Sequence, residues 1–162
     1  MSLKIASRTY YSFSEYKGNV NSIESISDAS GIVVPEGFVS IGSIWRSTGI
    51  IIPDTVISIG GIYYSSLIIP ASVESISKIE STGDRGNDKN KITISLKSKI
   101  PPMIGSIVDL SRFDSLMVPQ GALNAYKNHP IWGKFKNISE NPRLNSLTPN
   151  TTGTTTSSNN DE

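Results

Sequence analysis

The 162-residue chain contains no cysteine and only one histidine, and its acidic and basic side chains nearly balance. The absence of cysteine excludes disulfide bonds and thiolate metal sites. The formal net charge of +1 favours neither nucleic acid nor an anionic membrane surface as a partner. Hydrophobic residues make up 36% of the chain, a low share that favours a thin, repetitive core over a thick globular one.

Long apolar runs are also missing. No stretch has the length of a signal peptide or could cross a bilayer, so we expect neither a signal peptide nor membrane insertion. The expected location is a virion or the cytoplasm, or the cell surface if a signal was trimmed.

Three segments of the chain align on a proline. Pro35, Pro53 and Pro70 lie 18 and then 17 residues apart, and an apolar triplet precedes each of them. A weaker copy at residues 22–27 resembles residues 72–77. Such a period predicts a solenoid in which each copy forms one turn, here called a rung, and buries its apolar face against its neighbours.

The repeat places apolar residues at three fixed positions after each proline. We expect these positions to stack inward as columns along the solenoid. The columns are Phe38, Val56 and Val73 with Ile23; Ile41, Ile59 and Ile76 with Ile26; and Ile44, Ile62 and Ile79.

The β-branched triplet before each proline predicts one short strand per rung, ending at the proline because proline cannot donate to a sheet. A column of serines between the apolar columns is expected to bond turn backbone from rung to rung. This column consists of Ser25, Ser40, Ser58 and Ser75.

The period breaks after Ile79. Residues 81–90 form a polar insertion, residues 91–96 alternate like a strand, and residues 116–119 form a last strand-proline unit. Helical spacing then predicts a helix from Gln120 that ends at Pro130, followed by apolar residues that cover the open end of the core. We therefore divide the chain into an N-terminal docking or capping segment with a partial repeat (1–31), a solenoid with its C-terminal cap (32–140) and a Ser/Thr/Asn-rich tail (141–162).

Two stretches resemble the BspA-like leucine-rich repeat family. The first is Ile52-Pro53-Asp54-Thr55-Val56-Ile57-Ser58-Ile59-Gly60. The second begins with Ile100-Pro101-Pro102-Met103-Ile104-Gly105, continues with Leu116-Met117-Val118-Pro119 and ends with Trp132, Phe135 and Ile138. The resemblance implies a mainly β, right-handed leucine-rich-repeat solenoid with one strand per rung and a helical C-terminal cap. It also implies adhesion or protein binding, commonly at surfaces of bacteria of the Bacteroides kind, and related repeats occur in phage proteins.

The rungs are several residues shorter than those of that family. A rung near 18 residues also suits a left-handed β-helix of three hexapeptides, which stays open as the alternative fold.

Aromatic residues supply the candidate partner-binding positions. Trp45 and Tyr63 lie ten residues after their prolines, and Glu80 at the same position suggests that this column faces outward, with Arg46 and Tyr64 beside it. Aromatic and Arg side chains are favoured at interface hot spots. The alternative is that Trp45 and Tyr63 replace the family's buried phenylalanine.

A second aromatic cluster lies outside the matched repeats. It contains Tyr10, Tyr11 and Phe13, which either cap the first rung or dock onto another subunit.

Catalytic groups are scarce, so we expect no enzymatic activity and no cofactor. His129 is interpreted as a cation that complements carbonyls at a helix end. Asp84, Asn87 and Asp88 lack the spacing of a calcium loop and are interpreted as solvated.

The sequence thus predicts a non-catalytic module that binds a protein partner or its own copies. It would be a structural or receptor-facing subunit of an assembly such as a bacteriophage virion, or alternatively an adhesin-like protein. Carbohydrate could stack on the aromatics, but nothing else in the sequence supports it.

Overall fold

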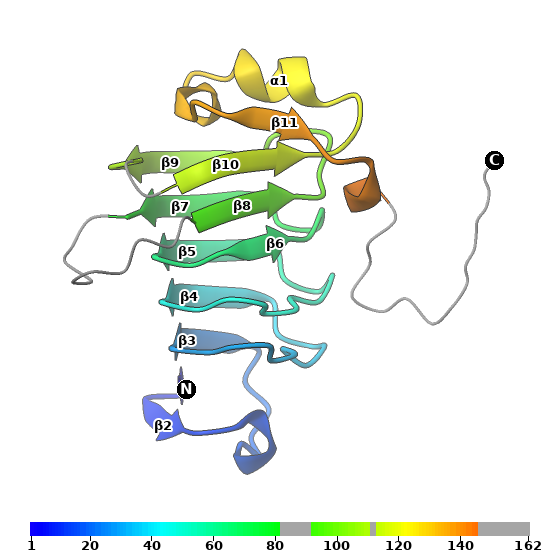
Figure 1. Cartoon of the computed structure of the whole chain (residues 1–162). Coiled ribbons are helices and arrows are strands. Elements are labelled where there is room, and N and C mark those ends of the chain that lie inside the picture. The colour runs from blue at the N-terminus through cyan, green and yellow to red at the C-terminus, as the bar shows by residue number, and fades with distance from the viewer. Residues whose placement is uncertain (82–91, 111–112, 146–162) are drawn as a thin grey trace.

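A computed structural model describes residues 1–81, 92–110 and 113–145. The chain is mainly β and coils into a solenoid of about six turns (Figure 1). Two sheets face each other across the core, and from β5 to β10 successive strands alternate between them.

The larger sheet has the strand order β2-β1-β3-β4-β5-β7-β9. Its strands are β1 (Ser2–Ile5), β2 (Arg8–Tyr10), β3 (Ser22–Ser27), β4 (Ser40–Trp45), β5 (Ser58–Tyr63), β7 (Ser75–Glu80) and β9 (Met103–Val108). The smaller sheet has the order β11-β10-β8-β6 and contains β6 (Leu67–Ile69), β8 (Ile92–Leu96), β10 (Phe113–Val118) and β11 (Ile138–Glu140). The short helices are η1 (Phe13–Glu15), α1 (Leu123–Lys127), η2 (Trp132–Lys134) and η3 (Pro142–Asn145).

The coil is right-handed. In Figure 1 the front strands β6, β8 and β10 run to the right and the rear strands β7 and β9 run to the left, while the chain climbs. The left-handed β-helix alternative is therefore wrong.

The predicted columns form the core. Ile41 pairs with Ile59 and Ile59 with Ile76, and each of the three is only 1% exposed. The parallel column Ile44, Ile62 and Ile79 is fully buried. These isoleucines stack one above another, as the repeat predicted.

The weak first copy was placed in the wrong register. Ile23 pairs with Ile41 and Ile26 with Ile44, three residues away from the predicted alignment. Each rung buries isoleucines three residues apart, so a shift of three preserves the apolar pattern. Only the backbone pairing distinguishes the two registers, and the first rung has Lys17 where the others have a proline.

The main strands also differ from the prediction. The long strands β4, β5 and β7 follow the prolines, whereas the triplet before Pro35 contributes only an isolated bridge between Val33 and Ile51. Gly31 and Gly49 precede the first two triplets with φ of +69° and +66°, which turns the chain there. The third rung lacks this glycine, and its triplet forms β6.

The serines that link rungs were also misidentified. Ser25 pairs with Ser43, and Ser40, Ser58 and Ser75 pair with one another along β4, β5 and β7, without a side-chain hydrogen bond from one rung to the next among the described residues. Among the serines that do link rungs, Ser47 and Ser65 are fully buried, and Ser72 Oγ donates to the Val56 carbonyl of the preceding rung at 2.7 Å.

Ser47 and Ser65 each bond in two directions. Ala29 N–H donates to Ser47 Oγ (3.0 Å), and Ser47 N–H donates to Ser65 Oγ (3.0 Å). Each hydroxyl in turn donates to the carbonyl two residues earlier, that of Trp45 (2.7 Å) or Tyr63 (2.9 Å). This satisfies buried backbone groups at a corner where no strand pairing does so.

Ser65→Ala should lower the free energy of unfolding by about 1–3 kcal/mol, because the buried Ser47 N–H loses its acceptor. The matched control is Ser58→Ala, which removes a half-buried hydroxyl at the start of β5, in the same rung. Urea denaturation of both variants checks this. Equal stabilities would contradict the role assigned to the Ser65 hydroxyl.

The C-terminal end of the core is covered by α1 and η2. Tyr126 and Trp132 are fully buried there, and Tyr126 Oη donates to the Ser98 carbonyl at 2.8 Å. Trp132 Nε1 donates to the Pro102 carbonyl at 3.0 Å. Burial raises the pKa of Tyr126 well above its ordinary value.

His129 does not act as predicted. Its Nδ1 accepts the backbone N–H groups of Ile131 (3.1 Å) and Trp132 (3.2 Å), at the start of η2. Through this nitrogen the imidazole bonds backbone N–H groups at the start of η2, whereas the predicted partners were the carbonyls at the end of the preceding helix. The predicted insertion with Asp84, Asn87 and Asp88 lies outside the described residues.

The N-terminal end is closed by a hairpin. β1 pairs antiparallel with both β2 and β3, whereas all later pairings are parallel. Among the described residues, no helix has the length and apolarity needed to cross a membrane.

Candidate interaction surface

Trp45 and Tyr63 lie side by side on the outer face of the larger sheet. They are in register on β4 and β5, with Ser27 and Glu80 at the same position of β3 and β7. Their rings stack with centroids 4.0 Å apart and planes 13° from parallel. Both are half-buried and neither belongs to the core, whereas the preceding isoleucines are fully buried. They have therefore not replaced buried core residues.

Small residues beneath the rings allow this stack. A Cβ at Gly61 would overlap the Tyr63 ring, so this ring lies directly over the glycine two residues earlier on its strand. Trp45 leans back in the same way, and its Nε1 donates to Ser43 Oγ at 2.9 Å. The two rings are held by the sheet below them and by each other.

Ion pairs lie on both sides of the stack. Lys78 and Glu80 form an ion pair at 2.9 Å in the next rung, and the hydrogen bond to Glu80, followed by its charge, raises the pKa of Lys78. In the rung of Trp45, Arg46 donates two hydrogen bonds to Asp28, from Nε at 2.8 Å and from Nη2 at 3.1 Å. The bond to Asp28 raises the pKa of Arg46 against a smaller lowering by burial. These pairs are exposed and contribute geometry more than stability.

Arg46 and Tyr64 occupy the same position in successive rungs but face different surroundings. Both adopt left-handed backbone, with φ of +48° and +52°. Arg46 is exposed beside the stack, whereas Tyr64 packs partly against the core. Arg46 therefore belongs to the surface, and Tyr64 contributes mainly to packing.

The N-terminal aromatics form a separate group. Tyr10 and Phe13 are half-buried and pack against the core at the first rung, whereas Tyr11 is 67% exposed. Phe13 contacts Phe38, which precedes β4, while Trp45 ends β4. The six residues of that strand separate the two groups by roughly 20 Å.

The residues that hold the stack were not predicted from the sequence. Ser43 bonds Trp45, Gly61 leaves room for the Tyr63 ring, and Asp28 holds Arg46 beside the stack. Glycine or serine two residues before an outward aromatic was the available signal, because side chains two apart on a strand share a face. No sequence pattern pointed to Asp28 as the partner of Arg46.

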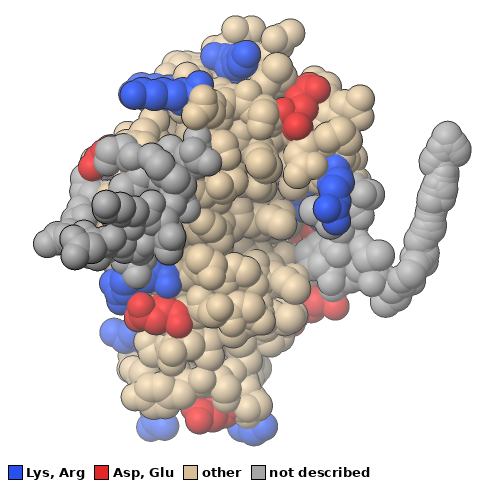
Figure 2. Space-filling model, viewed as in Figure 1, with Lys and Arg blue, Asp and Glu red and all other residues tan. Residues whose placement is uncertain are grey.

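An exposed apolar strip on the side of the smaller sheet was also not predicted, and it includes Ile68 of β6 and the bridged pair Val33 and Ile51. Val33, Ile51 and Ile68 occupy equivalent positions and are 60%, 43% and 44% exposed. Figure 2 shows this side of the molecule, where uncharged side chains cover the middle and charged ones are scattered around it.

Within the described ranges, no group of three or more His, Cys, Asp or Glu side chains is placed to hold a metal ion. No family model, curated protein or solved structure matches the chain.

Proposed function

We propose that this protein is a non-catalytic protein-binding module that uses the Trp45–Tyr63 stack as its contact surface. The supporting observation is the stack itself: two half-exposed rings fixed by a sheet, with Arg46 beside them. Rigid aromatic anchors lose little conformational entropy on binding, and aromatic and Arg side chains dominate interface energies.

We further propose that the solenoid is a short, divergent BspA-like leucine-rich repeat whose α1–η2 segment is the family's helical cap. Two observations support this. The turn Pro119-Gln120-Gly121-Ala122 repeats Pro35-Glu36-Gly37-Phe38, and both glycines have positive φ (+88° and +105°). The terminal rung is then a repeat followed by the aromatic cover of Tyr126 and Trp132.

The role that fits best is a structural or receptor-facing subunit of a larger assembly, such as a phage particle. An adhesin-like role would use the same surface on a host or matrix protein. Capture from the native source separates the two, because the first predicts a particle protein as the partner and the second a surface or matrix protein.

The double variant Trp45→Ala, Tyr63→Ala should lose at least about tenfold of partner capture, since anchor residues typically contribute 2 kcal/mol or more each. Its melting temperature should stay close to that of the wild type because neither ring is in the core. Quantitative pull-down from the native source, followed by mass spectrometry, measures the loss.

Two further variants sharpen this experiment. Gly61→Ala keeps both aromatics but displaces the Tyr63 ring, and it should weaken capture. Tyr11→Ala removes an exposed aromatic away from the stack and should not. Undiminished capture by the double variant would remove the stack from the proposed function.

A further inference from the structure

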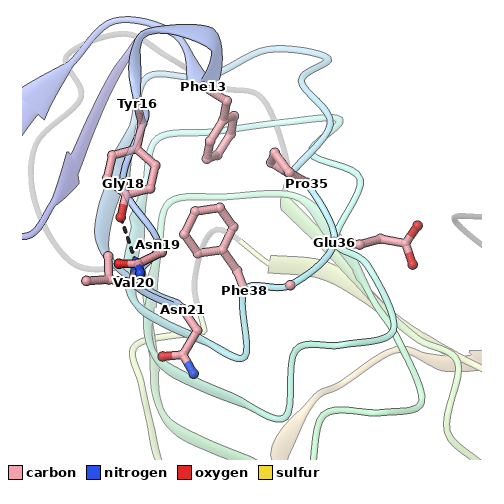
Figure 3. Close-up of a pocket in the computed structure, with 10 residues that line it drawn as sticks. Phe13, Tyr16, Gly18, Asn19, Val20, Asn21, Pro35, Glu36 and Phe38 are labelled. Carbon is pink, nitrogen blue, oxygen red and sulfur yellow. Dashed lines mark hydrogen bonds between the residues drawn. The ribbon is translucent and has the colours of Figure 1, made fainter.

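An aromatic pocket opens at the first turns of the solenoid (Figure 3). It has a volume of about 320 Å³ and lies between the turn at Gly18–Asn21 and the turn at Pro35–Phe38. Phe13 and Tyr16 lie 5.9 and 6.3 Å from Phe38, ring centroid to ring centroid.

Contacts within the chain fix the position of Tyr16 in the wall of this pocket. Tyr16 lies over Gly18, where a Cβ would overlap its ring, and its Oη accepts the Val20 N–H at 2.8 Å. Val20 remains 41% exposed. Figure 3 shows Glu36 pointing away from the rings, so the aromatic wall carries no charge, while Asn19 and Asn21 line the pocket opposite it.

An apolar knob protrudes from a later turn of the same chain. Ile100 and Met103 are 78% and 75% exposed, the highest values among the large apolar side chains of the described residues. They flank Pro101-Pro102. Exposed apolar groups of this kind commonly mark contact sites.

The knob is rigidly presented. Ser98 Oγ accepts the Ile100 N–H at 3.2 Å and donates to the Ile100 carbonyl at 2.6 Å. Trp132 and Tyr126 anchor the Pro102 and Ser98 carbonyls from inside. A preorganised loop loses little entropy when it binds.

Pocket and knob lie along one edge of the solenoid. The Pro35–Phe38 turn of the pocket and the turn at Ile100–Pro102 both lead the chain from the side of the smaller sheet to the larger one, at the right-hand edge of Figure 1, and Met103 begins β9. The turns at Pro53 and Pro70 separate them. A two-fold axis perpendicular to this edge would therefore bring the knob of each copy to the pocket of the other, an isologous arrangement.

The two sites carry one pair of opposite charges, and Lys17 also lies beside the pocket, directly before Gly18. Glu36 lies at the pocket rim, and the exposed Lys99 directly precedes Ile100. The antiparallel arrangement brings these opposite charges together twice. Within one copy, desolvation lowers the pKa of Lys97, while the charge of the nearby Asp54 raises it.

We propose that the chain forms a two-fold symmetric, antiparallel dimer in which Ile100 and Met103 of each copy pack into the Phe13–Tyr16–Phe38 pocket of the other. This goes beyond the function proposed above and does not depend on it. The Trp45–Tyr63 stack lies at the other end of the strands and stays free in the dimer.

Charge reversal tests the register of this dimer. Glu36→Lys and Lys99→Glu, both at exposed positions, should each weaken dimerisation at least tenfold, and the double reversal should restore it. Light scattering over a concentration series gives the dissociation constant, and melting temperatures confirm that each variant folds. Ile68→Asp, an exposed apolar position on the smaller sheet, is the matched control and should dimerise like the wild type.

A mixing experiment tests the pairing of knob with pocket. Ile100→Asp removes the knob, and Val20→Trp fills the pocket from its exposed rim, so each variant alone should be monomeric. An equimolar mixture should dimerise, because one intact contact remains. A wild-type monomer at millimolar concentration, a double reversal that fails to restore the dimer, or a monomer whose pocket binds a proline-rich peptide or a saccharide would overturn the proposal.

Discussion

Ile59→Ala should lower the free energy of unfolding by about 3 kcal/mol, the usual cost of truncating a large aliphatic residue in a packed core. Ile59 is 1% exposed and pairs with Ile41 on one side and Ile76 on the other. Its removal would leave a cavity that two rungs share. Since each rung is stabilised by its neighbours, the loss should be felt on both sides of the gap.

The control for this variant lies two residues away. Ile57 is 48% exposed, and its alanine variant removes the same atoms from the surface. It should change the free energy of unfolding by less than about 0.5 kcal/mol. Urea denaturation followed by circular dichroism measures both variants. If both variants lower the free energy of unfolding equally, the stacked columns do not form the core.

Trp132→Ala should lower the free energy of unfolding by about 4 kcal/mol, since truncating a buried aromatic residue removes a large apolar volume. The Trp132 ring packs between Tyr126, at 5.9 Å, and Phe135, at 6.3 Å. Its loss should uncover the last rungs, so hydrogen exchange should accelerate at β9 and β10 before β3 and β4. Thermal unfolding and exchange mass spectrometry check both effects.

Two variants separate the contributions of Trp132. Trp132→Phe keeps most of the ring but removes the hydrogen bond to the Pro102 carbonyl, and it should cost about 1–2 kcal/mol. Lys134→Ala, at an exposed position of the same helical turn, should be neutral. A uniform rise in exchange along the whole solenoid would contradict a local role for this residue.

The core columns were predictable from the repeat because each core position occurs once in every rung, so several residues report on the same position. Phe38, Val56 and Val73 occupy the same position in successive rungs. A polar residue at this position in any one rung would have indicated that the column faces solvent. The outward placement of Trp45 followed from Glu80 by the same comparison. Positions that recur in every rung therefore carry the strongest sequence signal.

Features that occur once or depend on backbone conformation were not predictable. The register of the first copy was missed because the buried residues at Ile23 and Ile26 fit two alignments equally well. Ser47 and Ser65 can link rungs because the chain turns just before them, at Arg46 and Tyr64, where the backbone has a positive φ. The pocket depends on how η1 lies against Phe38, which no periodicity describes.

The parallel pairing of equivalent residues has a consequence for how this fold can grow. Ser40, Ile41 and Ile44 pair with Ser58, Ile59 and Ile62, each 18 residues later, so one rung presents to the next the same surface that it receives. Duplication of such a unit would lengthen the solenoid by about 4.8 Å and leave both ends unchanged. In an antiparallel pair of copies, the span from pocket to knob would increase equally in each. Chains with more or fewer rungs could thus evolve, and two copies with the same number of rungs would still match each other as a dimer.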